Sequence, residues 1–357
     1  MNVAVEDRND GAAQTDTVTC PPGNPSPVIL RATGLKRSFG KVAAVEGVDL
    51  TVREGEIYGF LGVNGAGKTT TIRMLMGIIK PEAGLIELQG QQTRRTSIQQ
   101  KQGIGYVSQE QTFYPWMTAK ALGRFVGGLY PTWDAAEFER LLRVLDVPNG
   151  RKASQMSGGT RVKLALALAL APHPAILILD EPTSGLDPVA RREFLEIIKQ
   201  QARDHHRTTF FSSHIVGEIE RVADRVGIIH RGRMCYEGDL ETLRTTVRMV
   251  RVPVVETPRK AIPPADSDLA PPLLPEAANA TEAPPLQAPL PAMIPTAFVP
   301  GEGFEVLREE VHSGMRELLL RASPSAWAGL NQAGIEICNL SLEDIFIGLV
   351  RTRSATI

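Results

Sequence analysis

The stretch GVNGAGKTT, residues 62–70, constrains the fold of this chain more than any other segment. It fits the pattern G-x-x-x-x-G-K-[ST], follows the apolar run EIYGFL and opens the helix-like run TTTIRML. Glycines in such a loop let backbone N–H groups surround an anion, and the following helix adds the positive end of its dipole. Lys68 can reach β- and γ-phosphates, and the Thr69 hydroxyl can bind Mg²⁺. The segment therefore predicts a strand, a phosphate-binding loop and a helix.

Two carboxylates that follow an apolar strand predict the rest of a phosphate site. The run AILILD ends in Asp180, and Glu181 comes next. Asp180 is expected to hold the metal directly or through water, and Glu181 to polarise the attacking water. Two acids can also simply end a strand at the surface. Together with the phosphate loop they favour a nucleotide hydrolase.

Short apolar strands alternate with helical runs from residue 28 to about residue 243. This alternation indicates an α/β domain with a largely parallel core sheet. Residues 116–171 have a mainly helical pattern. The apolar stretch 164–179 is interrupted by a Pro-His-Pro sequence. It is therefore predicted as helix, turn and buried strand, because a membrane helix needs roughly 20 predominantly apolar residues.

Composition changes at both ends of this α/β domain. Residues 1–27 are polar and are expected to form a disordered leader. Residues 251–300 hold 13 of the 26 prolines, so residues 256–300 are predicted to be a disordered insertion. The pattern after it is strand, strand, helix, strand and helix. We predict a small α+β domain over residues 245–357, interrupted by that insertion.

Charge and cysteine content restrict the partners and the location. The net charge is -1 with a pI of about 6.6, so no overall basic excess favours nucleic acid as a partner. Three scattered cysteines suggest a reducing compartment and offer no zinc motif. The polar N-terminus does not resemble a secretory signal. These features predict a cytoplasmic protein.

Residues 30–243 resemble the nucleotide-binding subunits of ATP-binding cassette (ABC) transporters. Beyond the loop and the two acids, LKRSFG places Phe39 where the family has an adenine-stacking aromatic. GYVSQE places Gln109 at the glutamine loop, which senses Mg²⁺ and faces the membrane partner. MSGGT resembles the family signature and SGLD the D-loop, and FFSSH places His214 at the switch histidine.

The resemblance implies a set of site residues. The nucleotide would be bound by Phe39, Asn64, Gly65, Ala66, Gly67, Lys68, Thr69, Thr70, Ser157, Gly158, Gly159 and Asp187. The metal ligands would be Thr69, Gln109 and Asp180, and the catalytic residues Glu181, His214 and Gln109. In this assignment His214 positions Glu181 and the γ-phosphate. The implied cofactors are ATP and Mg²⁺.

The closer resemblance is to prokaryotic ABC-2 exporter-type ATPases, through LYPTWD, FFSSHIVGEIERVADRVGIIHRGRM and SLEDIFIGLV. It implies a P-loop NTPase cassette over residues 28–244, with a RecA-like core sheet, an antiparallel β-subdomain and a helical subdomain over about 114–171. Two cassettes, as a homodimer or heterodimer with a second ABC ATPase, would close head to tail around ATP. They would power a separate integral-membrane permease from the cytoplasmic face of the membrane.

Two alternatives belong to other classes. One is a soluble ABC ATPase that acts on ribosomes or nucleic acid without a permease. Against it, the chain has one cassette, no room for a coiled-coil arm between Gly67 and Asp180, and no basic run. The other is a non-hydrolysing regulatory subunit, which the intact Lys68, Glu181 and His214 disfavour. The sequence leaves the cargo open.

The signature departs from the usual Leu-Ser-Gly-Gly-Gln at its last position, where this chain has Thr160. Ser-Gly-Gly-Gln has the spacing of a capping box, in which the Gln side chain reaches back to the cap backbone. Thr160 is too short to do so. We therefore predict that Ser157 still caps the helix and binds phosphate, whereas Thr160 weakens the helix start or a contact with the opposite nucleotide.

Overall fold

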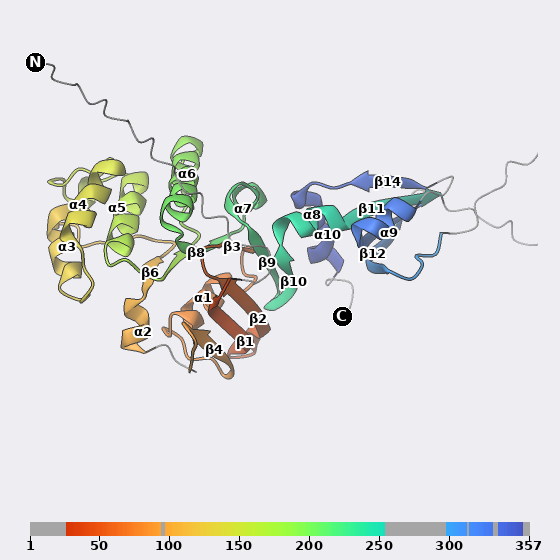
Figure 1. Ribbon diagram of the computed structural model, residues 1–357, viewed down its shortest axis with the longest axis horizontal. Coiled ribbons are helices and arrows are strands. Elements are labelled where there is room, and N and C mark those ends of the chain that lie inside the picture. The colour runs from red at the N-terminus through yellow and green to blue at the C-terminus, as the bar shows by residue number, and fades with distance from the viewer. Residues whose placement is uncertain (1–25, 94–96, 254–297, 313, 331–334, 353–357) are drawn as a thin grey trace, which may run out of the picture.

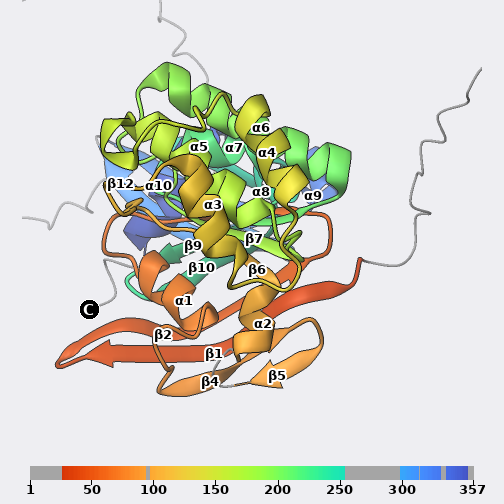
Figure 2. The ribbon, with the colours of Figure 1, turned by 90° about the vertical axis from the view of Figure 1, so that its left-hand side faces the viewer.

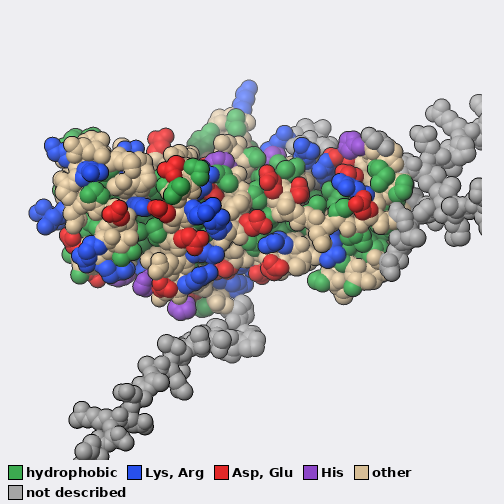
Figure 3. All heavy atoms as spheres, turned by 90° about the horizontal axis from the view of Figure 1, so that it is seen from above, with side chains coloured by type: hydrophobic (Ala, Val, Ile, Leu, Met, Phe, Trp, Pro, Cys, Tyr) green, Lys and Arg blue, Asp and Glu red, His purple; other side chains and the backbone are tan. Residues whose placement is uncertain are grey.

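The computed structural model describes residues 26–93, 97–253, 298–312, 314–330 and 335–352. The molecule is elongated, with the helices α3–α5 at one end and the C-terminal elements at the other (Figure 1). The predicted leader, except residues 26 and 27, and the predicted insertion up to residue 297 lie outside the described residues. Charged side chains of both signs are interspersed over the face shown in Figure 3.

A six-stranded sheet forms the centre of the fold, in the order β10-β9-β3-β8-β7-β6. Five strands are parallel and only β10 runs antiparallel, against β9. Its strands are β3 (Ile57–Leu61), β6 (Ile104–Val107), β7 (Ile176–Asp180), β8 (Thr208–Ser213), β9 (Arg225–His230) and β10 (Arg233–Asp239). The central strands β3, β7 and β8 are buried along their whole length because both faces of the sheet are covered. The predicted, largely parallel sheet is confirmed, although β6 and β10 had no predicted counterpart.

A second, antiparallel sheet covers one side of the core sheet, in the order β2-β1-β4-β5 (Figure 2). Its strands are β1 (Val28–Phe39), β2 (Val42–Arg53), β4 (Ala83–Leu88) and β5 (Gln91–Thr93). Helix α1 (Lys68–Leu75) packs between the two sheets, with Ile72, Met74 and Leu75 fully buried in one apolar cluster. The sheet is the antiparallel β-subdomain of the predicted fold class.

Helices α3 (Ala119–Gly127), α4 (Ala135–Val144), α5 (Gly158–Leu170) and α6 (Pro188–His205) lie on the side of the core sheet opposite the antiparallel sheet (Figure 2), and α3–α5 form one end of the molecule (Figure 1). The short helix α2 (Ile98–Gln102) lies near β4 and β5 (Figure 2). Side chains cap several of them at the N-terminus: Thr118 caps α3, Asp134 caps α4 and Ser157 caps α5. Such caps satisfy backbone N–H groups that have no partner within the helix. Helices α3–α5 form the predicted helical part.

The C-terminal region is a small α+β domain, as predicted. Its four-stranded antiparallel sheet has the order β12-β13-β11-β14. The elements after the core sheet are α8 (Leu240–Thr246), β11 (Val247–Pro253), β12 (Phe304–His312), β13 (Met315–Ala322), α9 (Pro324–Gly329), β14 (Glu336–Asn339) and α10 (Leu342–Thr352). The helix predicted between the second and third strands after the insertion is α9, which ends at Gly329. Phe298, predicted to be disordered, is instead buried against Trp327 and its neighbours.

This domain shares a core with the cassette. Ile345 and Phe346 of α10 pack in the same apolar cluster as Ile219 and Val222 of α7 (Val216–Val222), the helix that follows β8. Burial of these side chains removes apolar surface from water on both partners. The C-terminal domain is therefore packed on the cassette. Within the described residues, no helix is both long and apolar enough to cross a membrane.

Candidate nucleotide-binding site

The loop between β3 and α1 is shaped by glycine. Gly67, just before α1, has φ 107°, and a Cβ there would lie 2.5 Å from the backbone oxygen of Ala44. Only glycine fits both constraints. The backbone N–H groups at the start of α1 are thereby left open to an anion, with the helix dipole behind them.

A cavity of about 340 Å³ lies at the carboxyl edge of the core sheet, at this loop. Its lining residues are Ala44, Asn64, Gly65, Gly67, Lys68, Thr69, Thr70, Gln109 and Glu181. All but Ala44 were predicted as site residues. They meet because β3, β6 and β7 are parallel, so that the segments after them emerge at one edge. Ala66 is buried instead of lining the cavity.

The side chains of Lys68 and His214 both contact the Glu181 carboxyl in this site. Lys68 Nζ lies 2.9 Å from Glu181 Oε1, and His214 Nδ1 lies 2.8 Å from Glu181 Oε2. Burial raises the pKa of the Glu181 carboxyl, but the hydrogen bonds and charges of Lys68 and His214 outweigh it and hold that pKa below its usual value. Glu181 is therefore ionised at neutral pH, as a group that orients water must be.

Two hydroxyl groups donate hydrogen bonds to Asp180. Thr69 Oγ1 donates to Asp180 Oδ1 at 3.3 Å, and Ser212 Oγ donates to the same oxygen at 3.1 Å. Burial raises the pKa of Asp180, although both hydroxyls act against this. Carboxylate and hydroxyl oxygens are the ligands that Mg²⁺ prefers. The donor set therefore fits the predicted metal, whose positive charge would favour the ionised form of Asp180.

Ser212 is a site residue that sequence reasoning missed. Besides donating to Asp180, its hydroxyl accepts a hydrogen bond from the backbone N–H of Glu181 at 3.0 Å. The backbone of Glu181 has φ 44°, a left-handed conformation that is uncommon for residues other than glycine. The position of Ser212 in FFSSH, two residues before His214, places this serine near the site but does not reveal these contacts.

The remaining predicted residues lie outside this cavity. Phe39 is half exposed at the end of β1, with the Arg37 guanidinium carbon 5.1 Å from its ring centroid. Asp187 caps α6 by accepting from the backbone N–H groups of Val189 and Ala190, and these bonds lower its pKa. Ser157, Gly158 and Gly159 lie at the start of α5.

The signature serine caps its helix, as predicted. The backbone N–H of Thr160 donates to Ser157 Oγ at 3.1 Å. The Thr160 hydroxyl also lies 2.9 Å from Ser157 Oγ, so the two hydroxyls are hydrogen-bonded to each other. The side chain of Thr160 therefore contacts the Ser157 hydroxyl and not the backbone N–H of Ser157.

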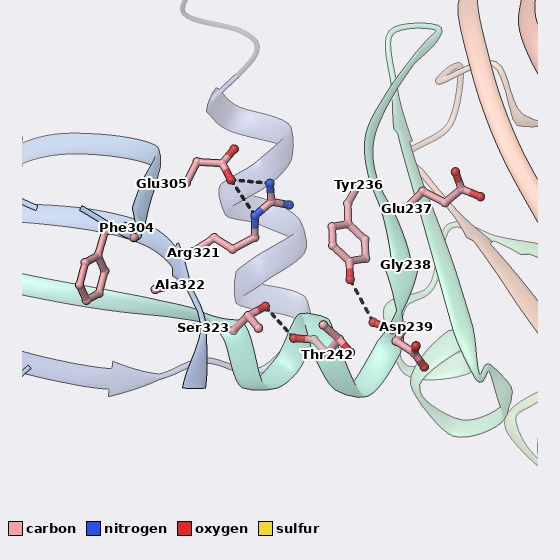
Figure 4. A pocket seen from close by; sticks show the side chains of 12 residues that line it. Tyr236, Glu237, Gly238, Asp239, Thr242, Phe304, Glu305, Arg321, Ala322 and Ser323 are labelled. Carbon is pink, nitrogen blue, oxygen red and sulfur yellow. Dashed lines mark hydrogen bonds and ion pairs between the residues drawn. The ribbon is translucent and has the colours of Figure 1, made fainter. Parts of the chain in front are cut away.

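A larger cavity of about 690 Å³ lies between β10, α8 and the C-terminal sheet (Figure 4). Glu305 and Arg321 form an ion pair on one side, and the Tyr236 hydroxyl donates to the Asp239 backbone oxygen on the other. None of the predicted site residues lines it. Size therefore does not identify the site: of these two cavities, the smaller one combines a helix N-terminus with Lys68, Thr69 and Glu181.

The fold and this cavity define a P-loop nucleotide-binding cassette. Residues 45–184 match the family described as ABC transporter. The bacitracin transport ATP-binding protein BcrA of Bacillus licheniformis is 37% identical over 218 residues, which cover 60% of this chain and 71% of the relative. NatA, an ABC transporter ATP-binding protein of Bacillus subtilis (strain 168), is 38% identical over 216 residues, which cover 58% of this chain and 86% of the relative.

Solved structures agree with these relatives. The structure of an ATP-binding subunit of an ABC transporter is 29% identical, with a TM-score of 0.54, over 60% of this chain and 92% of that one. The dimeric bacterial ABC transporter cassette MJ0796, at 21% identity, has the same fold with a TM-score of 0.54, over 59% and 99% of the two chains. The chain belongs to the ABC transporter ATP-binding proteins, and it is an ATPase. The predicted resemblance to exporter-type ATPases and the predicted fold class are confirmed.

Proposed function

We propose that this ATPase subunit powers a separate integral-membrane permease for export, through ATP-driven closure of two cassettes. The observation that carries this proposal is the cavity in which Lys68, Gln109 and Glu181 meet at the phosphate loop. It combines the groups that bind the phosphates with the segment that, in this family, faces the membrane partner. Hydrolysis and its transmission to a permease would therefore start from one site.

The residues of the cavity divide the chemistry of ATP hydrolysis among them. The open N–H groups of the phosphate loop and the Lys68 ammonium would bind the phosphates and offset their negative charge. Glu181 would orient the attacking water, held by His214 at 2.8 Å. Thr69, Asp180 and Gln109 would hold Mg²⁺, which supplies further charge neutralisation at the phosphates when bound.

Ser157 and the glycines after it would complete the site of a second cassette. The N-terminus of α5 offers N–H groups and the Ser157 hydroxyl, with no side chain at Gly158 or Gly159 to block an anion. Residues 157–160 include no carboxylate and no lysine. A homodimer, or a heterodimer with a second ABC ATPase, would supply the missing half. ATP would then stabilise the closed dimer, and hydrolysis would release it.

The permease would dock beside Gln109. Residues 111–113 line a cavity of about 360 Å³, together with Val126 and residues of α5. Next to this segment, Tyr114, Trp116 and Phe125 form an exposed aromatic cluster, with ring centroids 5.3 and 6.0 Å apart. Exposed aromatic side chains that gather at one place mark interaction sites. A short cytoplasmic helix of the permease with apolar side chains would fit this surface.

A pull-down from detergent-solubilised membranes tests the proposal. The tagged chain should recover an integral-membrane protein with about six apolar spans. Trp116→Ala should reduce that recovery, whereas Val144→Ala, an exposed apolar residue on α4, should not. Both variants should keep ATP binding. Recovery of ribosomes or DNA in place of a membrane protein would overturn the proposal.

A further inference from the structure

A buried carboxylate outside the nucleotide cavity has three polar partners. Glu218 lies on α7 with only 3% of its surface exposed. It accepts hydrogen bonds from Thr183 Oγ1 at 2.8 Å and from Ser213 Oγ at 2.5 Å. Arg191 Nε of α6 lies 3.3 Å from Glu218 Oε1. A carboxylate this deeply buried needs such partners because its desolvation is costly.

The two hydroxyl donors belong to segments that carry the predicted catalytic side chains. Thr183 comes two residues after Glu181, in the turn that follows β7. Ser213 immediately precedes His214, at the end of β8. Glu218 thus links the segment that follows Glu181 to the segment that precedes His214.

The same carboxylate is linked to two further parts of the site. The Ser213 backbone oxygen accepts from the N–H of Gly62, the first residue of the phosphate loop, at 3.3 Å. Arg191 Nη2 donates to the backbone oxygen of Leu186, next to Asp187, at 3.4 Å. The partners of Glu218 therefore contact the phosphate loop on one side and the D-loop-like segment on the other.

We propose that Glu218 is a positioning residue for ATP hydrolysis, which sets the distance between the side chains of Glu181 and His214. Its side chain does not line the nucleotide cavity, so it would act through the two hydroxyls and Arg191. Small displacements of catalytic groups cost large factors in rate because the reacting geometry is narrow. The inference rests on the proposed roles of Glu181 and His214.

Variants that differ in acceptor capacity test this role. Glu218→Ala removes the acceptor from both hydroxyls and the partner from Arg191. It should lower kcat about 10- to 100-fold while the equilibrium affinity for ATP is retained. Glu218→Gln keeps one oxygen that accepts from one of the two hydroxyls. The other hydroxyl can rotate and accept a hydrogen bond from the amide NH₂ group. The kcat of Glu218→Gln should lie closer to that of the wild type. Thermal unfolding and ATP titration are measured on each variant.

Two further variants complete the experiment. Glu220→Ala lies on the same helix, with a partly exposed side chain 3.8 Å from Arg244, and should leave kcat unchanged. Thr183→Val removes one donor at nearly constant volume, and should lower kcat even if Glu218→Ala does not fold. Wild-type kcat in folded Glu218→Ala and in Thr183→Val would overturn the inference. A purely structural role predicts that ATP affinity and thermal stability fall in parallel with kcat. If both Glu218 variants show this parallel loss, the inference is also overturned.

Glu181→Gln and His214→Ala in the same assay separate this inference from the roles on which it rests. If these two variants hydrolyse ATP normally, the proposed roles are wrong. If they are inactive and the Glu218 and Thr183 variants are not, only the positioning role of Glu218 is wrong.

Discussion

Lys68 Nζ lies 2.9 Å from Glu181 Oε1, in an ion pair whose two side chains are almost completely buried. The same ammonium donates to the backbone oxygen of Gly62 at 2.7 Å. Because Lys68 is also the proposed ligand of the phosphates, ATP would compete with Glu181 for this charge. Arrival of the nucleotide would thereby free the Glu181 carboxylate to orient a water molecule. Binding and activation of the carboxylate would be coupled through one side chain.

Glu181→Gln should nearly abolish ATP hydrolysis and keep ATP binding. The amide cannot accept a proton from water, and loss of a general base typically costs about 10²- to 10⁴-fold in rate. The phosphate loop and Lys68 remain intact in this variant. Phosphate release and ATP titration are the measurements. Glu193→Gln, a change at a largely exposed carboxylate paired with Lys163, is the control. Turnover of purified Glu181→Gln at the wild-type rate would show that Glu181 is not the base.

Phe39→Ala should weaken ATP binding with little effect on kcat. The ring is half exposed, and the Arg37 guanidinium lies near one of its faces. Stacking of a base on an aromatic ring is worth about 1–3 kcal/mol, so KM should rise about 5- to 150-fold. Phe39→Tyr keeps the ring and should behave like the wild type. An unchanged KM in Phe39→Ala would mean that the adenine lies elsewhere.

The phosphate loop could be predicted because its geometry is local in sequence. One strand, one loop and one helix within residues 57–75 determine it, and the motif records all three. Asp180 and Glu181 were found in the same way, as the end of a buried strand. Gln109 could be assigned only by family resemblance, because β6 is too short and too weakly patterned to reveal its place at the sheet edge.

The contacts of Ser212 and Glu218 could not be predicted from the sequence. Ser212 meets Asp180 because β7 and β8 are neighbouring parallel strands in register at these two residues. Glu218 is an unremarkable acid in a helical pattern until α7 folds it against Thr183. Both contacts depend on strand order and helix docking, which involve residues more than thirty positions apart. Nothing in the sequence of α10 reveals that this helix packs into the cassette core.

Helix α2 shows what the signature helix lacks. Ser97 Oγ accepts from the N–H of Gln100 at 3.2 Å, and Gln100 Oε1 accepts from the N–H of Ser97 at 2.9 Å. This is a complete capping box with Ser and Gln three residues apart. At the start of α5, Ser157 makes the first of these bonds, but Thr160 contacts the Ser157 hydroxyl in place of the backbone.

Thr160→Gln should tighten the ATP-driven dimer. The Gln side chain can complete the capping box. The hydrogen bond between the Thr160 and Ser157 hydroxyls is lost, which leaves the Ser157 hydroxyl free for its proposed contact with the opposite γ-phosphate. A hydrogen bond from the freed Ser157 hydroxyl to the opposite nucleotide would be worth about 0.5–1.5 kcal/mol, so the dissociation constant should fall about 2- to 13-fold. Sedimentation of the ATP-bound dimer in a Glu181→Gln background measures it. Thr160→Ser keeps the hydroxyl contact and should match the parent. An unchanged or weaker dimer in Thr160→Gln would make Thr160 a neutral variant of the signature.

Glu56 gives the fold a pH-dependent element outside the site. Burial raises the pKa of this carboxyl from its ordinary 4.5 to about 7, against the hydrogen bond from the Arg53 N–H and the charge of Arg225. That N–H lies 2.7 Å from Glu56 Oε1, and Arg225 Nε lies 3.7 Å from Oε2. Between pH 4.5 and about 7 the folded chain therefore binds more protons at this group than the unfolded chain. Its contribution to the free energy of unfolding falls as the pH rises through this window.

Glu56→Gln should remove that dependence. The amide oxygen can still accept from the Arg53 N–H, but the side chain no longer titrates. The unfolding temperature of the variant minus that of the wild type should therefore become more positive between pH 5 and pH 8. Differential scanning calorimetry at matched ionic strength measures this difference. Glu54→Gln removes a charge at an exposed carboxylate two residues earlier and is the matched control. A difference for Glu56→Gln that is flat, or that falls with rising pH, would show that Glu56 is ionised in the folded chain throughout this range.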